Sequence, residues 1–192
     1  MAVYGMFRFS FVQVWEAKAM SENQAPKYSV QCLVDKKDTA LIEKLKAAVQ
    51  LAIKAGVSKG VFTEAQAKSK NFKNPLRNGD EYYEESPSAA RETCKGNFFV
   101  NASAQADRQP AVVDNRAKPV MVRDDFYSGC YGYADINFYP FNKQGGMGIA
   151  AGLNSVMKKK DGDRLDGRLP AEQAFADVMD DEDSEDSEGQ LT

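Results

Sequence analysis

Apolar and polar residues alternate over two runs near the start of the chain, which is the pattern of half-buried β-strands. Residues 6–15 and 28–34 carry these runs, and a turn-rich loop separates them. The apolar side of the first run holds four aromatic residues: Phe7, Phe9, Phe11 and Trp15. Their shared parity predicts that all four, Trp15 included, face the core.

The period changes from two to three and four after the second run. Apolar residues then recur on one helical face, with Asp38 as the N-cap and Gly56 as the stop, so the pattern predicts one amphipathic helix. Residues 57–91 lose this period and are basic first and acidic afterwards. We expect an irregular excursion there, with a turn at residues 78–80.

Strand patterns return in the second half of the chain. The expected strands are residues 96–103, 111–113, 120–122, 129–141 and 147–157. Two glycines in residues 142–146 predict a hairpin turn between the last two strands. A short helix is expected at residues 171–179. Many strands, one early helix and no βαβ alternation predict a mainly antiparallel barrel or sandwich that carries a helix.

Charge is distributed unevenly along the 192 residues. Eight of the 28 acidic residues and none of the 25 basic residues lie in residues 177–192. The body, residues 1–176, therefore has an excess of five positive charges, and an acidic tail follows it. We expect one folded domain and a disordered tail, because the tail has too little apolar surface to fold. A basic body suggests nucleic acid as a ligand, although a modest lysine excess is also common among cytosolic proteins.

Cysteine and histidine usage narrows the chemistry. Three scattered cysteines and no histidine offer no zinc site and suggest a reduced, cytoplasmic protein, with no signal peptide and no membrane span. We expect no cofactor, no metal and no enzymatic activity. A carboxylate-dependent nuclease is kept as an alternative because it needs no histidine. Its candidate ligands are Asp35, Asp80, Asp114, Asp124 and Asp125, which share no grouping in the sequence.

Residues 131–141 (YGYADINFYPF) form the most informative run. Period two places three apolar residues on one face: Ala134, Ile136 and Phe138. The other face combines aromatic rings with polar groups: Tyr131, Tyr133, Asp135, Asn137, Tyr139 and Phe141. Aromatic rings on a strand can stack on unpaired bases of any sequence, so this face predicts a surface for single-stranded nucleic acid. The alternative is that these tyrosines pack beneath the 57–91 excursion.

A groove that follows a nucleic-acid backbone also needs cations. The candidates for this role are Lys73, Arg77, Lys95, Lys158, Lys159, Lys160 and Arg164. The three consecutive lysines lie where the last strand ends, and the alternative is that they are a solvated surface run. Trp15 is a secondary candidate for the aromatic surface.

Residues 127–139 (YSGCYGYADINFY) resemble a family of tailed-phage single-stranded DNA-binding proteins that was first catalogued as a domain of unknown function. Matching motifs stand in register at 26–30 (PKYSV), 74–80 (NPLRNGD), 148–156 (GIAAGLNSV) and 161–168 (DGDRLDGR). The resemblance spans residues 9–175. This chain departs from it at Tyr133, where a basic residue is expected, and at Asp166, where glycine is usual.

The resemblance implies an OB-fold-like antiparallel barrel that coats single-stranded DNA in replication and recombination. It also implies an acidic C-terminal tail that modulates DNA binding and contacts phage DNA polymerase, helicase or recombinase in the host cytoplasm. A tail that serves only solubility is the alternative. A homo-oligomer stays open, as does a replisome interaction module whose DNA contact is incidental.

Overall fold

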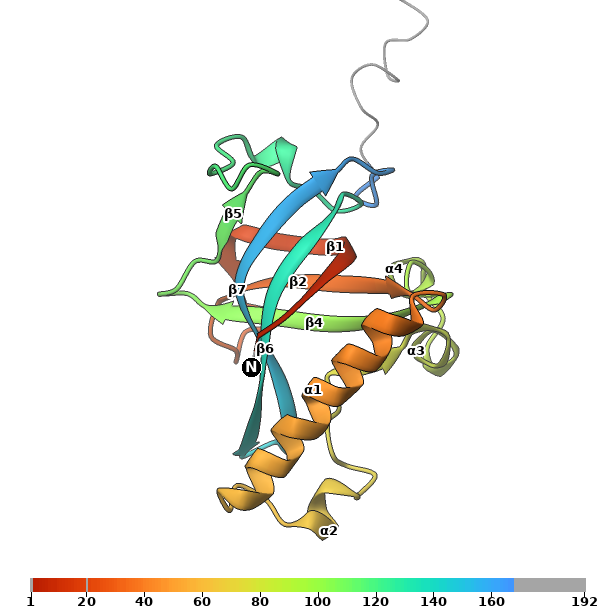
Figure 1. Cartoon of the computed structure of the whole chain (residues 1–192), viewed down its shortest axis with the longest axis vertical. Helices are drawn as coiled ribbons and strands as arrows, with labels where there is room; N and C mark the ends of the chain where they lie inside the picture. Colours follow the sequence, from red (N-terminus) through yellow and green to blue (C-terminus); the bar gives the residue numbers. More distant parts are fainter. Residues whose placement is uncertain (1, 20, 168–192) are drawn as a thin grey trace, which may run out of the picture.

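The computed structural model describes residues 2–19 and 21–167, and within them the strands form one continuous sheet (Figure 1). The strand order is β3-β4-β2-β1-β6-β7-β5, and an additional parallel pairing joins β4 to β7. The strands are β1 (Ala2–Lys18), β2 (Lys27–Asp35), β3 (Leu76–Asn78), β4 (Asn97–Gln105), β5 (Ala111–Val113), β6 (Tyr131–Lys143) and β7 (Gly146–Lys160). Because β4 also pairs with β7, the strands β1, β2, β4, β7 and β6 close into a barrel.

The barrel interior holds the apolar sides of these strands. Phe7 and Phe9 are buried, as are Ala134 and Ile136 on β6 and the inward side of β4. The predicted inward face of β6 is therefore confirmed. The three cysteines are free and buried. Burial raises the pKa of the Cys32 thiol, which keeps it in the unreactive neutral form.

The alternation of β1 breaks at Phe11. The pairing of β1 with β2 shifts register between Ser10 and Gln13, and Phe11 has a positive φ of 46°. An extra residue in a strand reverses the parity of everything after it. Phe11 is consequently 50% exposed, Val14 takes the core position, and Trp15 is partly buried against the core. The prediction that Phe11 shares the buried side with Phe7 and Phe9 is wrong.

The amphipathic helix is confirmed as α1 (Thr39–Ser58), which lies against β6 (Figure 1). The Asp38 side chain accepts a hydrogen bond from the Leu41 backbone N–H, as an N-cap does. Gly56 does not end the helix. It is buried inside it, where a Cβ atom would lie 2.4 Å from the Phe62 ring, and the chain turns away at Gly60, which has a φ of 67°.

The excursion after α1 is more ordered than its sequence predicts. It contains α2 (Glu64–Ala67), β3 and α3 (Gly79–Glu85), and α4 (Ala89–Glu92) follows. These elements are too short to show a period, so the sequence expectation of irregular chain was wrong here. The expected turn at residues 78–80 is the start of α3, where Asn78 is the N-cap.

The β6–β7 hairpin is confirmed, with its turn at Gln144 and Gly145. The expected strand at residues 120–122 is wrong: Met121 is 87% exposed, and a 3-10 helix (Arg123–Asp125) follows directly. The Val120 N–H donates one backbone hydrogen bond to the Val112 carbonyl, but residues 120–122 do not pair with β5 as a strand. The predicted helix at 171–179 and the tail at 177–192 lie outside the described residues. No helix within the described part is long and apolar enough to cross a membrane.

Candidate nucleic-acid interface

The outer face of β6 is the aromatic and polar strip that its sequence predicts. Tyr133 and Tyr139 are 38% and 43% exposed, and Asn137 and Phe141 are half-buried between and beside them. Tyr131 begins the same strip at the other end of the strand. Ten residues separate Tyr131 from Phe141, which is roughly 33 Å of extended strand. The strip therefore passes through two different surroundings, one at each end of β6.

At the hairpin end, a groove of about 1020 Å³ separates the β1–β2 loop from the β6–β7 turn. We call it the loop groove. Phe141 lines it beside three lysines, Lys27, Lys73 and Lys143. The ammonium groups of Lys27 and Lys143 have no ion-pair or hydrogen-bond partner among the described residues. Two cations are thus available beside an aromatic ring.

Lys73 is held at the groove by its backbone. Its N–H donates to the Met147 carbonyl over 3.0 Å, and its carbonyl accepts from the Ile149 N–H over 3.0 Å. This close approach requires Gly148, where a Cβ atom would lie 2.3 Å from the Lys73 carbonyl oxygen. The Lys73 ammonium donates to the Gly145 carbonyl over 3.2 Å, so its charge lies at the hairpin tip. Lys73 is 68 residues from Phe141 in sequence and shares the groove with it.

A smaller pocket of about 270 Å³ adjoins the loop groove, and Gln105 and Asp107 line both. We call it the amide pocket. Tyr139 and Asn137 of β6 border it, and Gly152 and Asn154 of β7 lie opposite. Arg108 also lines it, and its guanidinium has no partner among residues 2–19 and 21–167. The loop groove and the amide pocket together extend over the outer face of β4, β6 and β7.

The opposite end of the hairpin strands is a cluster of cations and rings, which we call the β7 pole. Lys160 and Arg8 lie over the Tyr131 ring, 4.7 and 5.6 Å from its centroid. Arg164 and Lys158 lie over the Tyr127 ring at 4.3 and 5.1 Å. Tyr131 is also covered by the chain itself, because a Cβ atom on Gly162 would lie 2.6 Å from its ring.

Most cations of the β7 pole already have partners. Lys158 pairs with Asp161 over 2.7 Å, Arg164 pairs with Asp166 over 3.3 Å, and Arg8 donates to the Asp163 carbonyl over 3.0 Å. The Tyr127 hydroxyl donates to Asp161 over 2.8 Å. These contacts lower the pKa of Asp161, first through the Lys158 hydrogen bond and then through Tyr127. Burial raises the pKa of Tyr127.

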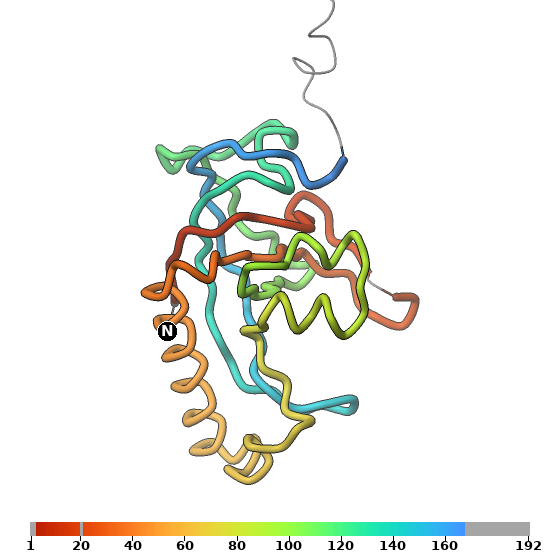
Figure 2. Tube along the Cα trace, turned by 90° about the vertical axis from the view of Figure 1, so that its right-hand side faces the viewer, coloured from red at the N-terminus to blue at the C-terminus, as the bar shows by residue number. Residues whose placement is uncertain are grey.

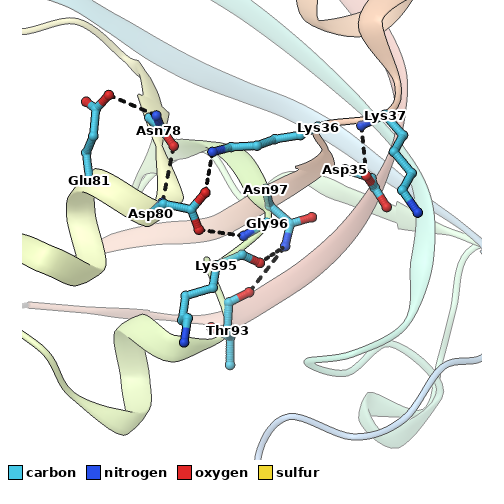
Figure 3. A network of polar contacts seen from close by, with 10 residues as sticks. All are labelled: Asp35, Lys36, Lys37, Asn78, Asp80, Glu81, Thr93, Lys95, Gly96 and Asn97. Atoms are coloured by element: carbon cyan, nitrogen blue, oxygen red, sulfur yellow. Dashed lines mark hydrogen bonds and ion pairs between the residues drawn. The ribbon is translucent and has the colours of Figure 1, made fainter.

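Two predicted cations, Arg77 and Lys95, lie on a third surface at α3 and α4. The Tyr82 ring lies between Arg77 and Arg91, whose guanidinium carbons are 4.3 and 3.9 Å from its centroid. Arg77 also pairs with Glu85 over 3.2 Å. Figure 3 shows the Lys95 side chain extending away from the neighbouring polar network, and its ammonium lies 4.6 Å from the Tyr83 ring centroid. Neither cation borders the loop groove.

The structure therefore divides the predicted site. It brings Lys73, Asn137, Tyr139 and Phe141 together at the loop groove and amide pocket, and it places Tyr131 and Arg164 with the three consecutive lysines at the β7 pole. Tyr133 lies between these surfaces. Trp15 lines neither the loop groove nor the amide pocket, and its indole N–H donates to the Phe126 carbonyl over 3.4 Å.

Sequence reasoning missed three residues that the fold places on or near the strip. Lys27 borders the predicted loop between the first two strands, and Lys143 borders the predicted hairpin turn. A lysine beside a predicted turn could have been recognised as a candidate cation in both cases. Tyr4 is 60% exposed and pairs with Asp135 of β6. Tyr4 precedes the run that was predicted to be a strand, so the sequence analysis did not assign it to either face of the sheet.

Three of the five carboxylates of the nuclease alternative have local structural roles. Asp80 binds the Lys36 ammonium and the Gly96 N–H, which lowers its pKa (Figure 3). Asp114 accepts from the Arg116 and Lys118 N–H groups of its own turn. Asp35 accepts from the Lys37 N–H. Within the described residues, no group of three or more acidic, cysteine or histidine side chains is placed to hold a metal ion.

A closed ring of β1, β2, β4, β7 and β6 with an open groove between its loops defines an OB-type barrel, a class that binds oligonucleotides on its outer face and loops. The chain belongs to the family described as Enterobacter phage Enc34, ssDNA-binding protein, whose model matches residues 1–186. The resemblance seen in the sequence is thereby confirmed.

Relatives and solved structures agree with this assignment. Putative protein p50 of Acyrthosiphon pisum secondary endosymbiont phage 1 is 31% identical over 165 residues, 83% of each chain. The single-stranded DNA-binding protein of bacteriophage Enc34, solved in complex with ssDNA, has a TM-score of 0.70 at 19% identity, covering 85% of this chain and 88% of that one. Bacteriophage T7 gp2.5, also a single-stranded DNA-binding protein, has a TM-score of 0.56 at 13% identity over 100% of both chains. At these identities the two structures establish the shared fold.

Proposed function

We propose that this protein binds single-stranded DNA without sequence preference and serves phage DNA replication and recombination. The observation that carries the proposal is the loop groove, where Phe141, Lys27 and Lys143 line one open channel on an OB-type barrel. The ammonium groups of both lysines have no partner among the described residues. Membership in a family described by ssDNA binding supports the same conclusion.

Binding would be passive and would have two parts. Tyr139 and Phe141 offer ring faces to unpaired bases, and stacking contributes about 1–3 kcal/mol per base whatever the base. Lys27, Lys73 and Lys143 lie near the phosphates, where each neutralised charge releases counterions. The cations and rings of the β7 pole stay as predicted contacts that would lengthen this path. No cofactor takes part.

We further propose that residues 177–192 regulate the groove. This acidic segment is tethered to a basic body, so its effective concentration is in roughly the millimolar range and it can compete with DNA. The same segment would recruit a phage polymerase, helicase or recombinase in the host cytoplasm. Removing it should tighten binding to single strands and weaken discrimination against duplex DNA. Unchanged affinity at low salt would leave the segment a solubility tail.

A salt titration tests the proposed function. The full chain is titrated with a fluorescent poly-dT oligonucleotide and with a duplex of matched length, while intrinsic tyrosine and tryptophan emission is followed. We expect tight single-strand binding that weakens as salt rises, with quenching of tyrosine emission. No binding at low salt would refute the proposal and favour the replisome interaction module instead. Magnesium-dependent degradation of the oligonucleotide would favour the nuclease.

A further inference from the structure

The amide pocket has the composition of a site for one planar polar group. Among the residues that line it are Asn137, Asn154, Tyr139, Ser103 and Gly152, whose side chains offer two amides, an aromatic ring and a hydroxyl. At about 270 Å³ it lies just below the size range of small-ligand pockets, so it suits a single ring system. It opens beside the loop groove, with which it shares Gln105.

The position of the Asn137 amide depends on a glycine. Asn137 pairs with Gly152 across β6 and β7, and Gly152 pairs with Ser103 across β7 and β4. A Cβ atom at position 152 would lie 2.6 Å from Asn137 Oδ1 and 3.2 Å from its Nδ2. The amide can therefore lie over the sheet only because residue 152 has no side chain.

The two amides of the pocket differ in availability. Asn154 Nδ2 donates to the Asp135 carboxylate over 3.2 Å, which occupies its donor. The Asn137 amide makes no hydrogen bond to any described residue, although the residue is half-buried. None of the described side-chain polar atoms is both buried and without a partner, so the Asn137 amide atoms reach solvent and are open to a ligand. One donor and one acceptor are thus held side by side in a base-sized space next to an aromatic ring.

We infer that Asn137 binds the Watson–Crick edge of one unpaired base seated against Tyr139, and that this contact selects single strands over duplex DNA. The inference rests on the proposed function and deepens it. Each base has a donor directly beside an acceptor on that edge, and an asparagine amide offers the complementary pair. Rotation of the amide by half a turn exchanges its donor and acceptor, so it suits all four bases.

This contact would give selectivity for strandedness without selectivity for sequence. In a duplex the Watson–Crick edge is occupied by the partner strand, so a paired base leaves the Asn137 amide without a partner. Ring stacking alone makes no such demand on the base edge, because every base has a ring face. The amide pocket therefore performs a task that the lysines of the loop groove cannot.

The decisive variant is Asn137→Asp, which keeps the shape but leaves two acceptors and no donor. Of the four bases, guanine alone has two adjacent donors on its Watson–Crick edge. We expect about ten-fold weaker binding to oligo-dT and a several-fold smaller loss on an alternating thymine–guanine oligonucleotide of equal length. Asn101→Asp is the matched control, because it adds the same charge at an exposed position of β4. It should lower the affinity for both oligonucleotides by the same factor.

Gly152→Ala tests the placement of the amide without removing it. The clash is with the end of a side chain that can move, so the fold should persist and its melting curve should match that of the wild type. We expect several-fold weaker binding to every single strand and a smaller ratio of single-strand to duplex affinity. The inference is overturned if Asn137→Asp shows no guanine preference or if Gly152→Ala binds as the wild type does. A wild type that binds neither oligonucleotide would instead refute the proposed function.

Discussion

The loop groove and the β7 pole contain the same kinds of residues and differ in what those residues already contact. At the β7 pole, Lys158, Arg164 and Arg8 each have an ion-pair or carbonyl partner within the chain. At the loop groove, Lys27 and Lys143 have none among the residues described. A cation that is already paired must give up that partner before it contacts a phosphate. The residue types of a surface therefore do not show by themselves that it binds DNA. The cations must also be free of partners within the chain, so that they can contact a phosphate.

The two surfaces also differ in how the chain reaches them. In Figure 2 the β6–β7 hairpin projects on one side of the barrel, and residues 111–125 and the last described residues lie together at the other end. At that end Leu165 donates its N–H to the Ser128 carbonyl over 2.8 Å and packs against Leu33, Cys94 and Phe99. The contacts of the β7 pole thus attach the last described residues to the barrel.

Removing the available cations should have the largest effect. We expect Lys27→Ala with Lys143→Ala to weaken single-strand binding by ten-fold or more at low salt. The slope of log affinity against log salt should fall by roughly 1.4, about 0.7 for each lost phosphate contact. The control is Lys158→Ala with Arg164→Ala at the β7 pole, which removes the same charge from two cations that are already paired within the chain. Equal losses in the two double variants would abolish the distinction between the surfaces.

Removing a ring should have a smaller effect that depends on its position. Phe141→Ala and Tyr139→Ala should each weaken binding several-fold, which is about 1 kcal/mol of binding free energy, the low end of the range for stacking on a base, with no change in the salt slope. Tyr131→Ala should chiefly lower the melting temperature, since its ring is covered by Gly162 and two cations. Fluorescence titration and thermal melting of all three variants separate the outcomes. A Tyr131 variant that melts normally but binds weakly would move the stacking surface to the pole.

The smallest effect concerns the stability of the β7 pole and its dependence on pH. Tyr127→Phe removes the hydroxyl that binds Asp161, and we expect a loss of about 1 kcal/mol, a few degrees in melting temperature, with unchanged DNA binding. The pKa of Asp161 is lowered in the folded protein, so its contribution is present above the ordinary carboxyl pKa and is lost as pH falls through the lowered value. In the variant the folded-state pKa of Asp161 is lowered less, so the acid loss should be smaller and should be complete at a higher pH. Melting curves between neutral and strongly acid pH measure both effects.

The strands and α1 could be predicted from the sequence because each has a clear period. The bulge in β1 could not, because Phe11 adopts a φ of 46° without the glycine that usually marks such a position. The end of α1 was predicted wrongly because Gly56 was taken as a helix stop. This glycine lies inside the helix instead, where it allows close packing against Phe62.

The sequence predicted which β6 residues share the face of the candidate site, but not which other parts of the chain lie beside them. The alternation of β6 correctly assigned Asn137, Tyr139 and Phe141 to one face. It could not show that residue 73 would join them, because Lys73 reaches the hairpin through backbone pairing with β7, far away in sequence. Nor could it show that Lys158 would be paired with Asp161, a contact set by the turn after β7.

Hydrogen–deuterium exchange of the full chain, with and without an oligo-dT strand, tests the account most directly. The account predicts that DNA slows exchange in peptides covering residues 21–27, 103–108 and 137–147, which form the loop groove and the amide pocket. Peptides covering residues 123–129 and 158–166 should be protected less, because most cations of the β7 pole already have partners within the chain. Protection confined to the β7 pole, with none at the β6–β7 hairpin, would contradict the claim that the loop groove holds the strand.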